Sequence, residues 1–216
     1  MRVGILGSGL MGGKLGTLFA RAGHEVVFSY SRSRNKLERL AREAGGSARA
    51  GTPDEAARDA DALLIAVHWL RVDDVLQQAG GLSGKVIVTC SLPMNDDDSE
   101  LVIAHTSSGA EELARKAPAA AVVSAFGSIP SEVLFAVFTN RGRDPRPSLV
   151  YCGDDEHPKN VVAQLIRDVG FDPVDAGPLR VARYIEPFTL LIAKLAYDGD
   201  ASPALAYRFE RFDEQA

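Results

Sequence analysis

Short apolar runs alternate with helical patterns along the first 126 residues of the chain. Between the runs, apolar side chains recur every three or four residues, as at Leu15, Leu18 and Phe19, which is the spacing of an amphipathic helix. Continuous apolar runs are typical of strands buried on both faces of a parallel sheet. We therefore expect an α/β domain with a doubly wound, mainly parallel sheet in residues 1–126. Its strands are predicted at residues 1–6, 25–28, 47–50, 62–67, 85–89 and 120–125.

A different pattern follows in residues 127–216 and predicts a small C-terminal α+β domain that completes the substrate cleft. A loop rich in glycine and proline precedes a strand, a helix that ends at Gly170, a second strand and a last helix. Pro187 is expected to kink that last helix. The loop, the two strands and the last helix are expected at residues 138–147, 149–152, 172–174 and 180–197.

Polar residues mark where two of the helices begin. Thr52 precedes Pro53 and stands three residues before Glu55, and Ser108 stands three residues before Glu111. This spacing is typical of a capping box, in which two side chains satisfy backbone N–H groups at the start of a helix. Proline is also favoured at the first helical position. We expect helices to begin immediately after Thr52 and Ser108.

The loop after the first strand has the spacing of a dinucleotide-binding fingerprint. Gly7, Gly9 and Gly12 stand between a predicted strand and a predicted helix, in a βαβ unit of about 30 residues. Such glycines permit a tight turn, a close approach of backbone N–H groups to a pyrophosphate, and close packing of helix on strand. A glycine-rich turn without a ligand is the alternative. The context favours a Rossmann-type domain that binds pyrophosphate through Gly7, Ser8, Gly9, Leu10, Met11 and Gly12.

The end of the second strand indicates which dinucleotide is bound. An NAD site usually has a carboxylate there for the ribose 2′-hydroxyl, whereas residues 30–36 of this chain contain arginine, lysine and serine and no acid. A 2′-phosphate needs a guanidinium and hydroxyl donors. The alternative is that these charges are only the solvated start of the second helix. We expect NADP(H), with its 2′-phosphate bound by Ser31, Arg32 and Lys36.

Composition narrows the class of protein further. The formal net charge of −5 argues against a nucleic-acid partner, and no apolar run reaches the roughly 20 residues of a membrane span. The first strand begins at residue 2 or 3, so no leader is expected. Cys90 and Cys152 are too few for a disulfide framework. The acidic run at residues 96–100 is expected to be a solvated loop rather than a metal site. We expect a cytoplasmic protein.

Catalytic side chains are scarce at the strand ends where a substrate would lie. His68 is the one candidate for a general acid, although a histidine at a strand end more often bonds backbone or water. An alcohol or hydroxy-acid dehydrogenase moves a proton together with the hydride and therefore needs a positioned acid or base. Hydride exchange between two planar molecules needs chiefly proximity and a dry slot. The sequence therefore favours direct hydride transfer, with no certain catalytic residue and no metal.

The chain resembles the coenzyme F420-dependent NADP oxidoreductases over essentially its whole length. The most specific likeness lies in residues 151–155, 175–179 and 183–187, and residues 123–130 are similar to the family's segment under the reacting rings. The resemblance implies hydride transfer between the nicotinamide and a 5-deazaflavin in a cleft between two domains, usually in a homodimer. The chain differs from the family at Gly127, where a histidine is expected, and at His68, where a proline is expected.

We therefore expect an NADP(H)-dependent oxidoreductase that acts on coenzyme F420 or a similar planar acceptor. The alternatives are an NADPH-dependent reductase of flavins or ferric chelates and a non-catalytic NADP(H)-binding sensor. Ala66, Val67, His68 and Trp69 are expected to flank the path from adenine to nicotinamide. The residues expected to line the acceptor slot are Phe126, Gly127, Ser128 and Leu179.

Overall fold

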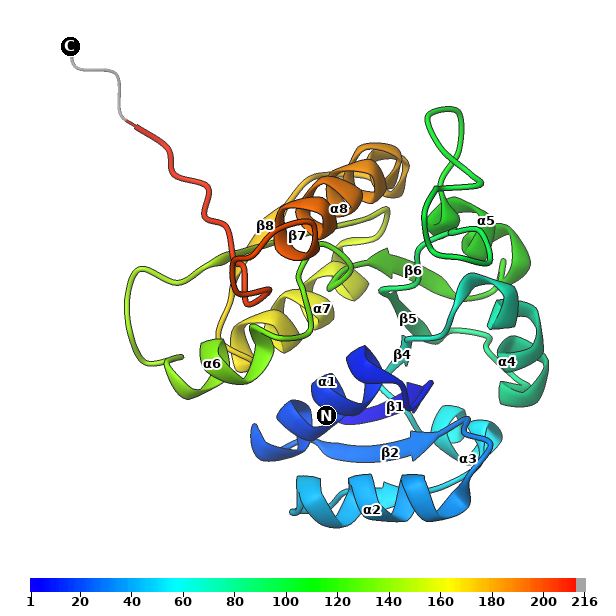
Figure 1. Cartoon of the computed structure of the whole chain (residues 1–216). Coiled ribbons are helices and arrows are strands. Elements are labelled where there is room, and N and C mark those ends of the chain that lie inside the picture. Colours follow the sequence, from blue (N-terminus) through cyan, green and yellow to red (C-terminus); the bar gives the residue numbers. More distant parts are fainter. Residues whose placement is uncertain (213–216) are drawn as a thin grey trace.

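The computed structural model describes residues 1–212 and contains one eight-stranded sheet with helices on both faces (Figure 1). The strands are β1 (Arg2–Leu6), β2 (Glu25–Ser29), β3 (Arg49–Ala50), β4 (Ala62–Ile65), β5 (Val86–Thr89), β6 (Ala121–Ser124), β7 (Ser148–Gly153) and β8 (Asp172–Asp175). They are ordered β3-β2-β1-β4-β5-β6-β7-β8, and all neighbours are parallel except β6 and β7. The predicted Rossmann-type doubly wound sheet is confirmed.

The helices form two layers, and each layer closes its own hydrophobic cluster against one face of the sheet. One layer contains α1 (Leu10–Arg21), α2 (Arg34–Ala44), α6 (Leu134–Thr139) and α7 (Glu156–Asp168). The other contains α3 (Pro53–Arg58), α4 (Val72–Ala79), α5 (Gly109–Lys116) and α8 (Ala182–Tyr197), with the short 3₁₀ turns η1 (Trp69–Arg71) and η2 (Leu179–Val181).

Strand β4 shows why its sequence reads as a continuous apolar run. Successive side chains of a strand point to opposite faces of the sheet. Leu64 accordingly packs with the cluster under α1 and α2, whereas Leu63 and Ile65 pack with the cluster under α3 and α4. Both faces are covered, so all four residues of β4 are buried. This burial explains the absence of alternation that the sequence shows at this strand.

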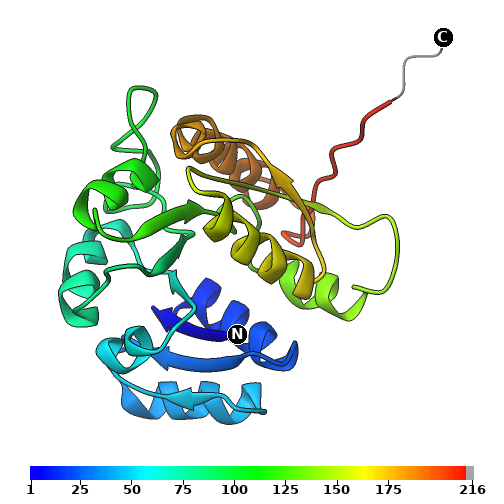
Figure 2. The same ribbon diagram turned by 180° about the vertical axis from the view of Figure 1, so that it is seen from behind.

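The C-terminal part of the chain extends the sheet, which the sequence did not indicate. We expected β6 to complete the sheet, but β7 pairs antiparallel with β6, and β8 pairs parallel with β7. Figure 2 shows β7, α7 and β8 beside β6, at the end of the sheet opposite β3. An apolar run indicates that a strand is buried, but it does not indicate which strand lies next to it in the sheet. For this reason the sequence predicts β7 as a strand but not as a neighbour of β6. The expected domain boundary after residue 126 lies shortly after β6 and stays a prediction.

The start of the predicted loop at residues 138–147 was also wrong. Residues 134–139 form the short helix α6, whose sequence LFAVFT contains β-branched and aromatic residues. Such residues have low helix propensity, and six residues are too few to show a helical period. Packing decides the conformation instead, because Leu134 and Phe138 are buried in the cluster that also contains α1 residues.

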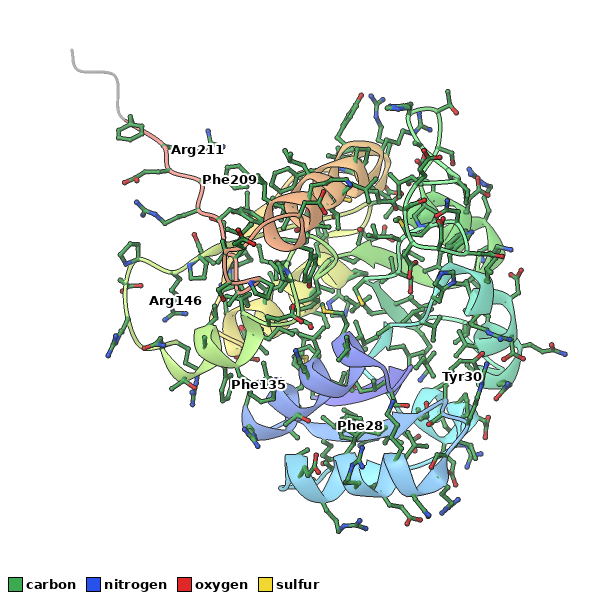
Figure 3. The ribbon with its side chains drawn as sticks, in the orientation of Figure 1. Phe28, Tyr30, Phe135, Arg146, Phe209 and Arg211 are labelled. Atoms are coloured by element: carbon green, nitrogen blue, oxygen red, sulfur yellow. The ribbon has the colours of Figure 1, made fainter. Side chains whose placement is uncertain are left out.

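Residues 198–212, the last described segment, follow α8 without forming a helix or strand, and we call them the C-terminal strap. Tyr207 fixes the strap to the body. Its carbonyl oxygen accepts a hydrogen bond from the Ser148 N–H at 2.8 Å, and its hydroxyl lies 2.7 Å from the Ser128 hydroxyl. The Tyr207 ring packs edge-on against Phe188 of α8 at 5.2 Å between centroids. The Phe209 N–H donates a hydrogen bond to the Ser148 hydroxyl at 3.0 Å, and beyond it the strap extends away from the body at Arg211 (Figure 3).

Candidate functional site

The loop between β1 and α1 has the backbone geometry that a pyrophosphate site needs. Gly7 has φ +123°, and a Cβ there would overlap the carbonyl oxygen of Ala66. A Cβ on Gly12 would overlap the carbonyl oxygen of Gly7, so glycine is needed for α1 to lie this close to β1. A Cβ on Gly9 would meet nothing within 4 Å. The approach to the first turn of α1 is therefore open, and no side chain caps its N–H groups.

A cavity of about 760 Å³ opens from this loop along the carboxyl ends of β1, β2 and β4. It brings together most of the residues predicted to bind the coenzyme, namely Gly7, Ser8, Gly9, Ser31, Arg32, Lys36, Ala66, Val67 and His68. The other predicted coenzyme residues lie beside it. Leu10 is exposed at the start of α1, and Met11 and Trp69 pack against the two hydrophobic clusters. The assignment of each residue to coenzyme binding stays a prediction.

Cationic side chains gather on one wall of the cavity, just beyond the end of β2. Arg32, Arg34 and Lys36 come from the segment that enters α2, and Arg71 comes from η1. Ser33 caps α2 by accepting a hydrogen bond from the Lys36 N–H, which fixes the turn that carries these charges. Positive charge and hydroxyl groups at this position fit a phosphate on the ribose 2′-oxygen.

Arg71 is a residue of this wall that the sequence analysis missed. It lies more than 30 positions after the other cations and reaches the cavity only because η1 turns the chain back at the end of β4. The available signal was its position four residues after a predicted strand, at the edge of the sheet where ligands bind.

Tyr30 and Asp74 join two walls of the cavity. The Tyr30 hydroxyl donates a hydrogen bond to the Asp74 carboxylate, which links the end of β2 to α4. Burial, followed by this contact with Asp74, raises the pKa of Tyr30 to about 12, so its hydroxyl is protonated at neutral pH. The same hydrogen bond lowers the pKa of Asp74. Neither residue was predicted as part of the site, because their contact depends on how α4 packs relative to β2.

His68 has partners on both of its ring nitrogens. Its Nδ1 accepts a hydrogen bond from the Leu70 N–H at 3.3 Å, which makes His68 the cap of η1. Its Nε2 lies 3.0 Å from the carboxylate of Asp98 in the acidic loop. The bond to the Leu70 N–H agrees with the expectation that a histidine at a strand end bonds the backbone. Together the two contacts hold the chain in place at the end of β4. A general-acid role stays a prediction.

The four residues assigned to the acceptor slot have different surroundings. Phe126, with φ +65°, is fully buried and packs edge-on against Phe19. Ser128 and Leu179 are also buried. Gly127 is partly exposed, and a Cβ there would lie 3.6 Å from the carbonyl oxygen of Cys90, an ordinary contact. The role of these residues in binding an acceptor stays a prediction.

Cys90 does not offer a reactive thiolate beside Gly127. Burial raises the pKa of its thiol to about 12, and only the deprotonated form of cysteine is an effective nucleophile. The environment of Gly127 therefore does not supply a nucleophile through this cysteine.

Comparison with known proteins agrees with the fold and the glycine loop. Residues 2–93 match the family model "NADP oxidoreductase coenzyme F420-dependent", which confirms the predicted resemblance over that part of the chain. The metalloreductase STEAP3 of Rattus norvegicus is 33% identical over 189 residues, which are 88% of this chain and 36% of STEAP3. The chain thus spans only about a third of the length of that curated relative.

Two solved structures share the fold over nearly the whole chain. A candidate F420-dependent NADP reductase from Arthrobacter sp. FB24 has a TM-score of 0.85 and 22% identity, covering 98% of this chain and 100% of its own. The hypothetical protein SMa0349 from Sinorhizobium meliloti has a TM-score of 0.75 and 24% identity, covering 97% and 96%. The matched family consists of NADP-dependent oxidoreductases. No helix in residues 1–212 is both long and apolar enough to span a membrane.

Proposed function

We propose, from the match of residues 2–93 to the coenzyme F420-dependent NADP oxidoreductases, that this chain transfers a hydride between NADP(H) and a planar acceptor. The observation that carries the proposal is the single cavity that joins the open glycine loop to the cationic wall. Those two features fit the pyrophosphate and the 2′-phosphate of the same molecule. The residues present therefore fit NADP(H).

Each part of the site has a physical task in this reaction. The backbone N–H groups after Gly9 and the side chain of Ser8 bind the pyrophosphate, and Arg32 and Lys36 neutralise the 2′-phosphate. Ala66 and Val67 provide an apolar edge along the coenzyme at the end of β4. The bound coenzyme supplies the hydride. The protein supplies proximity, orientation and exclusion of water, which suffice when no proton must move with the hydride.

Coenzyme F420 is the acceptor that we propose first. The family match and the resemblance of residues 123–130 and 175–179 support a deazaflavin. Gly127 carries no side chain where the family is expected to carry a histidine, so the acceptor need not be the family's usual one. The similarity to the metalloreductase STEAP3 supports a second candidate, reduction of a flavin or a ferric chelate. A hydride carries two electrons, so a reduced flavin would pass them one at a time to two equivalents of the ferric chelate.

The experiment is a screen of NADPH oxidation at 340 nm under anaerobic conditions. Coenzyme F420, FMN, FAD and ferric citrate are offered as acceptors in parallel, and NADH replaces NADPH in a matched series. We expect turnover with F420 and preference for NADPH. Turnover with FMN or ferric citrate alone would select the second candidate. Tight binding of NADPH without turnover of any acceptor would instead support a non-catalytic NADP(H) sensor.

We further propose that the chain works as a cytoplasmic homodimer. The exposed side of α8 supports a partner of the same kind, because Tyr184, Leu191 and Leu195 lie on it with more than half of each side chain exposed. Both cysteines are free thiols, as expected in a reducing compartment. Light scattering of the wild type and of Leu191→Glu tests the dimer, and equal monomeric masses would contradict it.

A further inference from the structure

Tyr30 adopts a backbone conformation that a large side chain rarely takes. Its φ of +58° lies in the left-handed region, which favours glycine and is costly for other residues. Such strain persists only where the surroundings fix the residue, and it is concentrated at ligand sites. Tyr30 is fixed here by its hydrogen bond to Asp74. This backbone conformation brings the Tyr30 side chain to the wall of the cavity, where the chain leaves β2.

Asp74 is itself held by a second side chain. The amide nitrogen of Gln78, one turn further along α4, donates to both carboxylate oxygens of Asp74 at 3.1 Å. The Gln78 amide is thereby oriented with its nitrogen on Asp74, and its carbonyl oxygen is available as an acceptor for a ligand. Tyr30, Asp74 and Gln78 form one connected network, which we call the Tyr30 network, and all three line the cavity.

The Tyr30 network lies in the part of the cavity where the base of a bound NADP(H) must be. The glycine loop takes the pyrophosphate, and Arg32 takes the 2′-phosphate of the adenosine ribose. The adenine is bonded to that same ribose, so it lies beside Arg32 and not beside the nicotinamide. The lining of the cavity contains Arg71, Asp74 and Gln78 as well as Arg32, and the charges of Arg32 and Arg71 both act on the Tyr30 hydroxyl. A planar base fits there between the end of β2 and α4.

We propose that the Tyr30 network recognises the exocyclic amino group of adenine. This inference rests on the proposed binding of NADP(H). The oxygen atoms of Asp74 and Gln78 are hydrogen-bond acceptors, and the amino group of adenine offers two donors. A hypoxanthine base carries a carbonyl oxygen at the same position, which those acceptors would repel. Asp74 and Gln78 are thus specificity-determining residues, and Tyr30 is a positioning residue that holds Asp74.

The test compares NADPH with its hypoxanthine analogue, reduced nicotinamide hypoxanthine dinucleotide phosphate, by calorimetric titration. We expect the wild-type protein to bind NADPH about tenfold more tightly, the effect of exchanging one good hydrogen bond for an unsatisfied group. Gln78→Ala should lower that ratio, because Asp74 is then the one remaining acceptor for the amino group. Gln77→Ala is the matched control, because Gln77 is an exposed neighbour on α4 that does not line the cavity.

The Tyr30→Phe variant tests whether Tyr30 positions Asp74 for the coenzyme or only stabilises the fold. It removes the bond to Asp74 but keeps the aromatic ring, so the preference for NADPH over the analogue should fall. A purely structural role would instead weaken both coenzymes equally and leave the ratio unchanged. Equal binding of the two coenzymes by the wild type, or an unchanged ratio in Gln78→Ala, would overturn the inference. Binding of neither coenzyme by the wild type would overturn the proposed function together with it.

Discussion

Arg32 was predicted to bind the coenzyme from an absence in the sequence, because the segment after β2 has no carboxylate. The structure places its side chain in the same cavity as the glycine loop, although the two are more than 20 positions apart. This relation could be predicted because both follow parallel neighbouring strands, whose carboxyl ends meet at one edge. The contribution of α4 could not be predicted, since the positions of Asp74 and Gln78 depend on how this helix, which follows β4 and η1, packs relative to β2.

Replacing Arg32 by aspartate should weaken NADPH binding by about a hundredfold, because a charge-assisted bond is lost and a repulsive charge replaces it. NADH lacks the 2′-phosphate, so its affinity should change little. Calorimetric titration with both coenzymes measures the difference. Arg39→Asp serves as the control, because Arg39 is exposed, pairs with Glu43 and does not line the cavity. Equal losses for NADPH and NADH would contradict the assignment.

Glu186 of α8 is a buried carboxyl group at the start of another helix. It is 3% exposed, and it accepts hydrogen bonds from the N–H groups of Gly109 and Ala110 at 2.9 and 3.0 Å. Burial raises its pKa from 4.5 to about 7 despite these two bonds, and the charge of Glu111 acts in the same direction. Charged and neutral forms of Glu186 therefore coexist near neutral pH.

The raised pKa of Glu186 makes the free energy of unfolding depend on pH. Between about pH 4.5 and 7 the folded chain retains a proton that the unfolded chain releases, so this contribution is present at low pH and is lost as the pH rises. It amounts to about 3 kcal/mol over the whole window. Glu186→Gln cannot titrate, so urea unfolding should show a flatter pH profile for the variant than for the wild type. Parallel profiles would contradict this.

Helix starts were the most predictable elements, because their signals are local. Thr52 caps α3 with the complete capping box that its spacing with Glu55 predicted. Ser108 accepts a hydrogen bond from the Glu111 N–H, but Glu111 turns its carboxylate to Arg183 at 2.8 Å instead of completing the box. The difference has a tertiary cause, since Arg183 lies more than 70 positions later on α8. Local sequence therefore predicts where a helix begins better than what its side chains contact.

The cap of α3 should make a measurable contribution to stability. Thr52→Ala removes the acceptor for the Glu55 N–H at 3.2 Å, which should lower the free energy of unfolding by about 1 kcal/mol. Thr139→Ala is the control, because Thr139 is exposed near the end of α6 and bonds only back to the Phe135 carbonyl. Chemical denaturation without coenzyme compares the two. An effect of Thr139→Ala as large as that of Thr52→Ala would count against the cap.

At the scale of the whole molecule, the C-terminal strap connects parts that are far apart in sequence. Tyr207 contacts both hydrophobic clusters, and its hydroxyl also accepts a hydrogen bond from the Val150 N–H at 3.3 Å. The sequence has no periodicity that could predict these contacts of Tyr207, because the strap forms neither helix nor strand. The general architecture could be read from alternating patterns, whereas the path of an irregular segment depends on the surface that it covers.

Tyr207→Ala should destabilise the fold by about 3 kcal/mol, since an aromatic side chain and its hydroxyl are removed from a packed site. Phe212→Ala, later in the same strap, should have almost no effect, because that side chain is 86% exposed. Thermal unfolding of the two variants measures the contrast. Similar losses would mean that the strap is not anchored at Tyr207.

The antiparallel junction of β6 and β7 is short, with Val123 opposite Gly153 and Ser124 opposite Cys152. Few ladder hydrogen bonds join the first six strands to β7, α7 and β8, whereas β1 and β2 are paired along five residues. Fewer backbone hydrogen bonds must break to open the sheet at this seam than between β1 and β2, although one hydrophobic cluster packs across it. Gly127 follows β6 by three residues, so opening of the sheet at this seam would change the surroundings of Gly127 first. The same backbone could then hold its coenzyme firmly while admitting and releasing a second molecule.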